Sequence, residues 1–107
     1  MGYYTDHKLE IEPEDFDLLR RIITSESSDA DIRFAVDEDG SCYDSSKWYD
    51  HDSDMRELSK KWPDVTFHLH GEGEENNDIW TATYKNGLCH HRSAQIFIEP
   101  YDPSRLE

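Results

Sequence analysis

A two-residue turn near the C-terminal end constrains the fold of this chain more than any other feature. Asn86-Gly87 is the pair preferred in a type I′ β-turn, because both central positions of that turn need positive φ. Residues 79–85 before it are rich in the β-branched and aromatic side chains that are typical of a strand. We therefore predict an antiparallel hairpin that pairs Lys85 with Leu88, Tyr84 with Cys89, Ala82 with His91 and Trp80 with Ser93.

The strand after this turn does not keep its apolar side chains on one face. In the register above, Ala94, Ile96 and Ile98 lie on the face opposite Trp80. A β-bulge near residues 91–93 would return them to the same face, and we predict one there.

Three other segments alternate apolar and polar side chains, which favours half-buried strands. They are residues 7–11, 32–36 and 65–70. Two helices are expected between them. Residues 12–25 carry an apolar stripe that includes Phe16, and Pro13 fits the first turn of such a helix. The second helix is predicted to run to about Trp62, before a proline stops it.

The predicted order of elements is β-α-β followed by α-β-β-β. This order indicates a single α+β domain over residues 1–107, with a mostly antiparallel sheet and two helices on one face, of ferredoxin-like type. Hydrophobic residues make up only 35% of the chain, but the aromatic share of 12% can still fill a modest core.

The charge balance restricts the partners. The chain has 25 acidic and 11 basic residues and a formal net charge of −14. Such a field repels nucleic-acid phosphate and anionic membranes, and it attracts basic proteins. No transmembrane run or signal peptide is found, and two cysteines, Cys42 and Cys89, make no disulfide framework, so a cytoplasmic protein is expected. An acidic surface that serves only solubility is the open alternative.

Carboxylates recur in three stretches that we predict to bind a basic partner. The predicted partner-binding residues are Glu10, Glu12, Glu14, Asp15, Asp17, Asp37, Glu38, Asp39, Glu72, Glu74 and Glu75. Those in the last stretch lie in an acidic loop between two strands, where Gly71 and Gly73 permit positive φ. Carboxylates on one glycine-rich loop are poorly fixed for paired-carboxylate catalysis, so no catalytic residue and no cofactor is predicted.

The histidines give an alternative hypothesis. His68 and His70 share one face of a predicted strand, and an H-x-H pair can bind zinc from one side. His91 would have to join them, with the Glu72–Glu75 loop nearby, to make a metal-dependent enzyme. The polar face of a half-buried strand explains the same residues without a metal, and we predict none.

Three segments within residues 47–87 are distinctive: "KWYDHDSDM", "LSKKWPDVTFHLHGEGEENNDIW" and "YKNG". With the opening "MGYYTDHKLEI", which is also similar, they resemble a family of small uncharacterised proteins of phages, prophages and related mobile elements. It implies a ferredoxin-like α+β fold and a mobile-element origin, and it implies no activity.

Charge and resemblance together predict a non-enzymatic binding protein of phage or mobile-element type. It would inhibit a basic nucleic-acid-handling host protein, such as a CRISPR effector or a nuclease, in the cytoplasm of a bacterial host. That is the role of an anti-CRISPR, anti-restriction or DNA-mimic factor. The alternatives are an immunity protein for a toxic nuclease and the metal-dependent enzyme with His68, His70 and His91.

Overall fold

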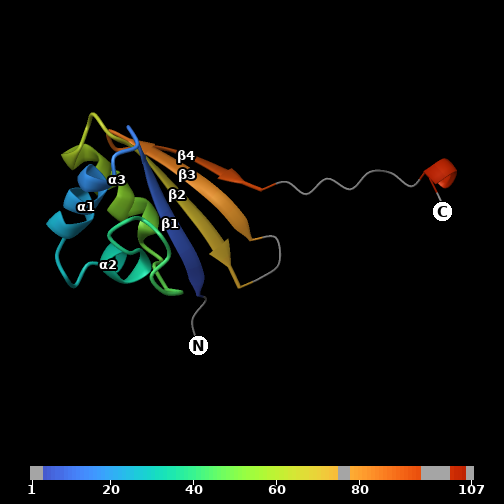
Figure 1. Ribbon diagram of the computed structural model, residues 1–107, viewed down its shortest axis with the longest axis horizontal. Coiled ribbons are helices and arrows are strands. Elements are labelled where there is room, and N and C mark those ends of the chain that lie inside the picture. Colours follow the sequence, from blue (N-terminus) through green and yellow to red (C-terminus); the bar gives the residue numbers. More distant parts are fainter. Residues whose placement is uncertain (1–3, 75–77, 95–101, 106–107) are drawn as a thin grey trace.

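The computed structural model describes residues 4–74, 78–94 and 102–105. Within them, four strands form one antiparallel sheet in the order β1-β2-β3-β4 (Figure 1). The strands are β1 (Thr5–Glu12), β2 (Thr66–Gly73), β3 (Ile79–Lys85) and β4 (Leu88–Ser93). The helices are α1 (Phe16–Ser25), α2 (Asp31–Ala35) and α3 (His51–Lys61), and the 3₁₀ turn η1 spans Pro103–Arg105.

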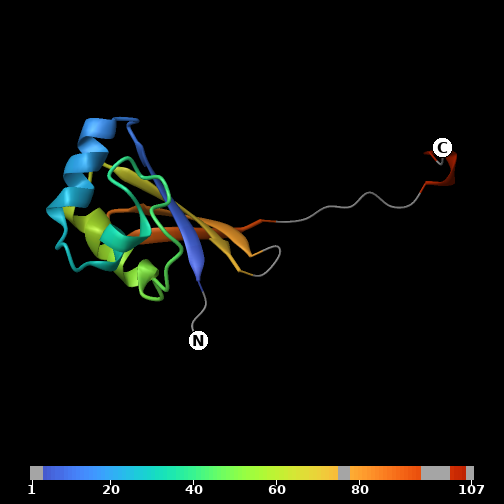
Figure 2. The same ribbon diagram turned by 60° about the horizontal axis from the view of Figure 1, so that its bottom comes forward.

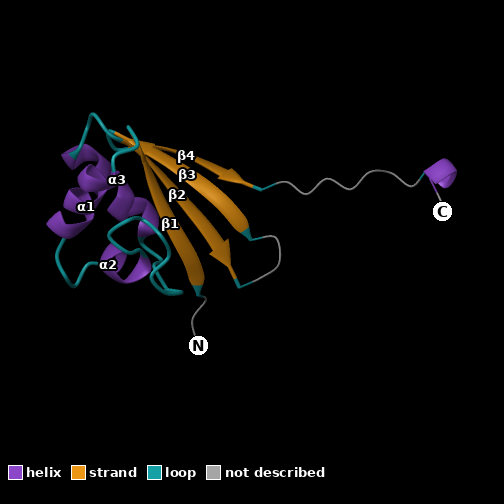
Figure 3. Cartoon of the chain, in the orientation of Figure 1, coloured by secondary structure: helices purple, strands orange, loops and turns teal. Residues whose placement is uncertain are grey.

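The three helices cover one face of the sheet and leave the other face uncovered by described residues (Figures 2 and 3). Alternation along the strands explains this arrangement, because successive side chains point to opposite faces. The buried strand residues on the helix side include Leu9, Ile11, Phe67, Leu69, Ala82 and Tyr84. They meet Leu19, Ile22, Ile23, Met55 and Leu58 from the helices to form the core. None of the described helices has the length and apolar character needed to cross a bilayer.

The α+β class and the hairpin are confirmed. Asn86 and Gly87 have φ values of 50° and 81°, and the strands pair in the predicted register. The turn is also fixed by α3, since the Gly87 N–H donates to the buried Ser59 Oγ at 2.8 Å and Arg56 Nη1 donates to the Gly87 carbonyl at 3.2 Å. The order of elements differs from the β-α-β-β-α-β order of ferredoxin-like domains, because all three helices fall between β1 and β2.

The predicted strand over residues 32–36 is wrong, because this segment lies mainly in helix α2. Ile32 and Ala35 are the buried residues, at a helical spacing of three, whereas Phe34 is 54% exposed. A five-residue segment is too short for its periodicity to separate a helix from a strand. Val36, at its end, makes only an isolated bridge with Cys42.

The predicted bulge is also wrong within the described residues. Pairing between β3 and β4 is continuous from Lys85↔Leu88 to Trp80↔Ser93. The bulge was inferred on the premise that β4 buries one face, but β4 is an edge strand whose side chains are almost all exposed. Ile96 and Ile98 lie outside the described residues.

Helix α1 begins later than predicted. Asp15 is the N-cap, and its carboxylate accepts hydrogen bonds from the backbone N–H groups of Asp17 and Leu18 at 3.0 and 3.1 Å. Pro13 therefore precedes the helix. Phe16, which was predicted to be buried, is the first helical residue and is 74% exposed. This exposure turns an expected core residue into a surface residue.

The outer edge of β1 is covered by the loop of residues 37–46. The Leu9 N–H donates to the Gly40 carbonyl at 2.7 Å, and Thr5 exchanges two backbone hydrogen bonds with Ser46. Gly40 has a φ of +85°, and a Cβ atom at this position would lie 2.0 Å from the Leu9 carbonyl oxygen. Only glycine fits this close approach, which fixes the acidic loop residues before Gly40 against the sheet.

Candidate functional site

Carboxylates from three separate segments gather around Phe16. One cavity, of about 260 Å³, is lined by the apolar side chains of Leu9, Ile11, Phe16 and Leu19 together with Lys8, Glu10, Glu14, Asp15 and Asp39. An adjoining cavity of about 320 Å³ is lined by Phe16, Asp17, Arg20, Asp37, Glu38 and Asp39. We call these residues the Phe16 surface. It unites seven carboxylates from β1, the start of α1 and the loop over the β1 edge.

Several of these carboxylates are held by hydrogen bonds. Asp39 Oδ1 accepts from the Ser41 N–H at 2.9 Å, and hydrogen bonds from Ser41 hold the pKa of Asp39 below its usual value. Glu10 pairs with Lys8 at 3.2 Å, and that hydrogen bond is the main cause of a lowered Glu10 pKa. Asp15 caps α1. Hydrogen bonding to the charged form favours ionisation, so Asp39 and Glu10 stay negative in neutral solution.

The other predicted partner-binding residues do not join this surface. Glu12 lies on the uncovered face of the sheet, where its Oε1 is 3.1 Å from His68 Nε2. Glu72 and Glu74 lie at the opposite end of the β1–β2 pair, and Glu74 Oε1 accepts from the Tyr4 N–H at 2.8 Å. Glu75 lies outside the described residues. The predicted set is therefore divided among at least three places.

A second acidic region lies between α2 and α3, and the predicted site residues did not include it. Its cavity of about 400 Å³ has Ile32, Trp48 and Met55 among its lining residues. Six carboxylates line the same cavity: Glu26, Asp29, Asp31, Asp50, Asp54 and Glu57. We call it the α2–α3 groove. The signal in the sequence is the excess of eleven acidic over three basic residues between positions 26 and 57.

Two contacts tie this groove to the core. Trp48 is buried, and its Nε1–H donates to Asp54 Oδ2 at 2.7 Å. Lys61 Nζ lies 3.0 Å from Glu26 Oε2, which links the end of α3 to the end of α1. Placing Asp29 and Asp31 beside α3 requires α2 to be a helix. Because residues 32–36 were assigned to a strand, this groove was not predicted from the sequence.

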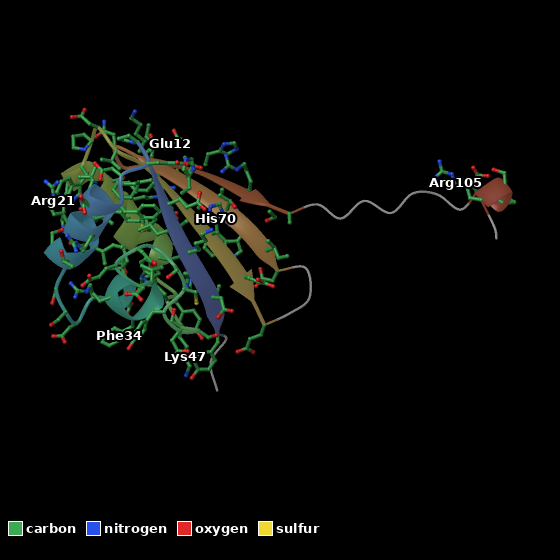
Figure 4. All side chains as sticks on the ribbon, in the orientation of Figure 1. Glu12, Arg21, Phe34, Lys47, His70 and Arg105 are labelled. Atoms are coloured by element: carbon green, nitrogen blue, oxygen red, sulfur yellow. The ribbon has the colours of Figure 1, made fainter. Side chains whose placement is uncertain are left out.

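His68 and His70 lie side by side on the uncovered face, as predicted. Their Nδ1 atoms lie 2.9 and 2.8 Å from the hydroxyls of Thr83 and Thr81. Their Nε2 atoms face the carboxylates of Glu12 and Glu10 at 3.1 and 3.7 Å. In Figure 4, His70 lies on the sheet, whereas Arg21 and Phe34 lie on helices.

The metal hypothesis that joined His91 to this pair fails on geometry. His91 pairs with Ala82, so its side chain lies on the helix side of the sheet, opposite His68 and His70. Across the described ranges, no group of three or more His, Cys, Asp or Glu side chains is placed to hold a metal ion. The histidines on the uncovered face instead form a polar network with threonine and glutamate.

The acidic loop between β2 and β3 is shorter than its sequence suggested. β2 continues through Gly73, and neither Gly71 nor Gly73 has positive φ. Gly71 is required for another reason: a Cβ atom there would lie 2.2 Å from the indole of Trp80. The expectation that these glycines take positive φ is therefore wrong.

Trp80 belongs to a cluster of histidine and tryptophan rings. It stacks on His51 and His91 at centroid distances of 4.8 and 5.5 Å, and the edge of His7 approaches at 6.0 Å. Trp48 lies 5.4 Å from His7. The cluster borders a cavity of about 210 Å³ and brings the segment of Trp48 and His51 against Trp80 of β3. It connects the end of the sheet to the start of α3.

His7, in strand β1, is 1% exposed and was not among the predicted site residues. Burial, and to a smaller extent the nearby His51, lower its pKa to about 4. Unfolded His7 takes up a proton near its ordinary pKa of about 6.5, while the folded form resists protonation until the pH is much lower. Its contribution to stability is therefore present above pH 6.5 and is lost as the pH falls toward the folded pKa.

Lowering the pH from 7 to 5 is expected to cost about 2 kcal/mol of unfolding free energy through His7 alone. Denaturant unfolding of the wild type and of His7→Gln at both pH values measures this contribution, because other titrating groups are shared by the two proteins. The loss between the two pH values should be smaller in the variant. Equal losses would show that His7 does not stay neutral in the folded protein.

Searches against protein-family models, curated proteins and solved structures gave no match to this chain. The functional argument therefore rests on the residues and on their placement.

Proposed function

We propose that this protein is a non-enzymatic binding protein that occupies the basic groove of a nucleic-acid-handling protein and inhibits it. The observation that carries the proposal is the Phe16 surface, where seven acidic residues from three segments line two adjoining cavities beside one exposed aromatic ring. The loop that supplies three of them is anchored to β1 through Gly40. A fixed array of charges costs less to bind than a flexible one, because less conformational freedom is lost.

The electrostatics favour a protein partner that is itself basic. A surface that carries a net charge of −14 raises the rate of encounter with a cationic groove, and the effect falls as salt is added. A groove that binds DNA already presents lysine and arginine side chains at the spacing of phosphates. Carboxylates on the Phe16 surface and in the α2–α3 groove can take the place of those phosphates, although a protein has neither bases nor a sugar backbone.

The proposal includes the finer expectations from the sequence. The partner would be a CRISPR effector, a restriction enzyme or another nuclease, and the setting would be the cytoplasm of a bacterial host. A phage or mobile-element origin fits this role, because such elements gain from blocking host nucleases. The support for this part is the sequence resemblance over residues 47–87 together with the charge.

Capture from a bacterial lysate tests the proposal. Tagged protein on beads is exposed to lysate that has been treated with nuclease to remove nucleic acid, and bound proteins are eluted with increasing salt. We expect a basic nucleic-acid-handling protein that is retained at low salt and released at high salt. A partner that is itself a toxic nuclease would make this chain an immunity protein. Recovery of salt-insensitive partners only, or of none, would contradict an electrostatic inhibitor.

A further inference from the structure

The smaller cavity of the Phe16 surface combines an apolar interior with an acidic rim. Leu9, Ile11 and Leu19, which are at most 4% exposed, reach it from the core, and the ring of Phe16 stands beside them. Four acidic residues, Glu10, Glu14, Asp15 and Asp39, are also among its lining residues, and the carboxylate of Glu10 faces His70 on the uncovered face of the sheet. The cavity has a volume of about 260 Å³, which leaves room for one aliphatic side chain.

The exposure of Phe16 matters because of where the ring lies. Single exposed apolar residues are common on protein surfaces and need no explanation. Phe16, however, lines both adjoining cavities, and the smaller one is also lined by Leu9 and Leu19, which are 1% and 3% exposed. The backbone of Phe16 is held at the start of α1, because the residue before it caps the helix. The ring of Phe16 is therefore the main exposed apolar surface of this cavity, and it stands at a fixed place in the fold.

We infer that this cavity accepts an apolar side chain from a partner segment that carries lysine or arginine on both sides of that residue. The inference rests on the proposed function and names the chemistry of the partner segment. Charge complementarity selects the occupant, since the acidic residues that line the cavity repel an acidic segment and attract flanking cations. Nucleic acid is the wrong occupant, because its phosphates are repelled.

Two short synthetic peptides test this inference. One is Lys-Arg-Leu-Arg-Lys, and the other has serine in place of leucine. Their affinities are measured by NMR titration at about 0.15 M salt, where the Debye length is about 8 Å. We expect the leucine peptide to bind about tenfold more tightly, because it buries an aliphatic side chain that the serine peptide lacks. Phe16→Ser should remove most of this difference while both peptides still bind.

Phe34→Ser is the matched control, because Phe34 is also an exposed phenylalanine on a helix and lines neither cavity (Figure 4). It should leave the tenfold difference unchanged. Equal affinities of the two peptides for the wild type, or a difference that survives Phe16→Ser, would overturn the inference. So would the absence of binding by either peptide at millimolar concentrations.

The proposed function can be judged separately. The two peptides could bind with equal affinity, and both affinities could fall when Glu14→Lys and Asp17→Lys are introduced. That result would support the electrostatic binding surface and would contradict only the role of the apolar cavity. Loss of salt-sensitive capture from the lysate would remove the proposed function itself. Circular dichroism of each variant confirms that the fold is retained.

Discussion

Reversing three exposed carboxylates of the Phe16 surface is expected to weaken binding to the captured partner about a hundredfold. The substitutions are Glu14→Lys, Asp17→Lys and Glu38→Lys. They change the charge of the surface by six units and place cations opposite a cationic groove, which lowers the association rate and adds repulsion in the complex. Asp15 is left intact because its carboxylate caps α1. Surface plasmon resonance at two salt concentrations measures both rates.

The matched control changes the same total charge elsewhere. Asp44→Lys, Asp64→Lys and Asp102→Lys replace exposed carboxylates that line neither the Phe16 surface nor the α2–α3 groove. This variant should lose much less affinity than the first one. If both variants lose the same affinity for the partner, only the net charge matters. If neither variant loses affinity, binding does not depend on the acidic surface.

Gly40→Ala is expected to destabilise the fold by about 3 kcal/mol or more. The residue has a φ of +85°, which costs about 1–2 kcal/mol for a residue with a Cβ atom. The new Cβ atom would also lie 2.0 Å from the Leu9 carbonyl oxygen, and overpacking of this kind adds about 1–3 kcal/mol. Relief of the contact requires the loop to leave the β1 edge, so the variant should also bind the partner less tightly.

Ser41→Ala in the same loop is the comparison for this glycine. It removes the hydroxyl that donates to Asp39 but keeps the backbone that faces β1. We expect it to cost about 1 kcal/mol or less, because an exposed hydrogen bond contributes little. Chemical denaturation of the two variants checks both values. A Gly40→Ala protein as stable as Ser41→Ala would show that the loop is not anchored through this backbone contact.

The sequence predicted those parts of the fold that follow from local rules. Asn86-Gly87 determines its turn and, through it, the register of two strands, because few residue pairs tolerate positive φ at both positions. Alternation along residues 65–70 placed Phe67 and Leu69 in the core, as observed. Both regularities act over a few residues, and tertiary contacts did not override them.

The missed features depend on contacts between distant segments. Helix α2 is too short for periodicity to identify it, and packing of Ile32 and Ala35 into the core accompanies its helical form. Phe16 is the first residue of α1 and is exposed, whereas the buried residues of this helix begin at Leu19. The sequence alone suggests that Gly71 is a loop glycine. The structure shows that it is needed because the Trp80 indole packs against its backbone.

The candidate site was predicted in part. The clusters at residues 14–17 and 37–39 do meet, because the loop over the β1 edge brings them together through Gly40. Glu12, Glu72 and Glu74 were assigned to the same surface by charge alone, and strand direction separates them. The α2–α3 groove could not be assembled without knowing that residues 31–35 are helical.

Competition for the partner tests the central claim most directly. The captured partner is bound to a fluorescent DNA or RNA duplex that it recognises, and increasing amounts of this protein are added while anisotropy is followed. We predict release of the duplex at near-stoichiometric protein, with the midpoint shifted to much higher concentration for the Glu14→Lys, Asp17→Lys, Glu38→Lys variant. A stable ternary complex, in which the partner holds both the duplex and this protein, would contradict occupation of the nucleic-acid groove.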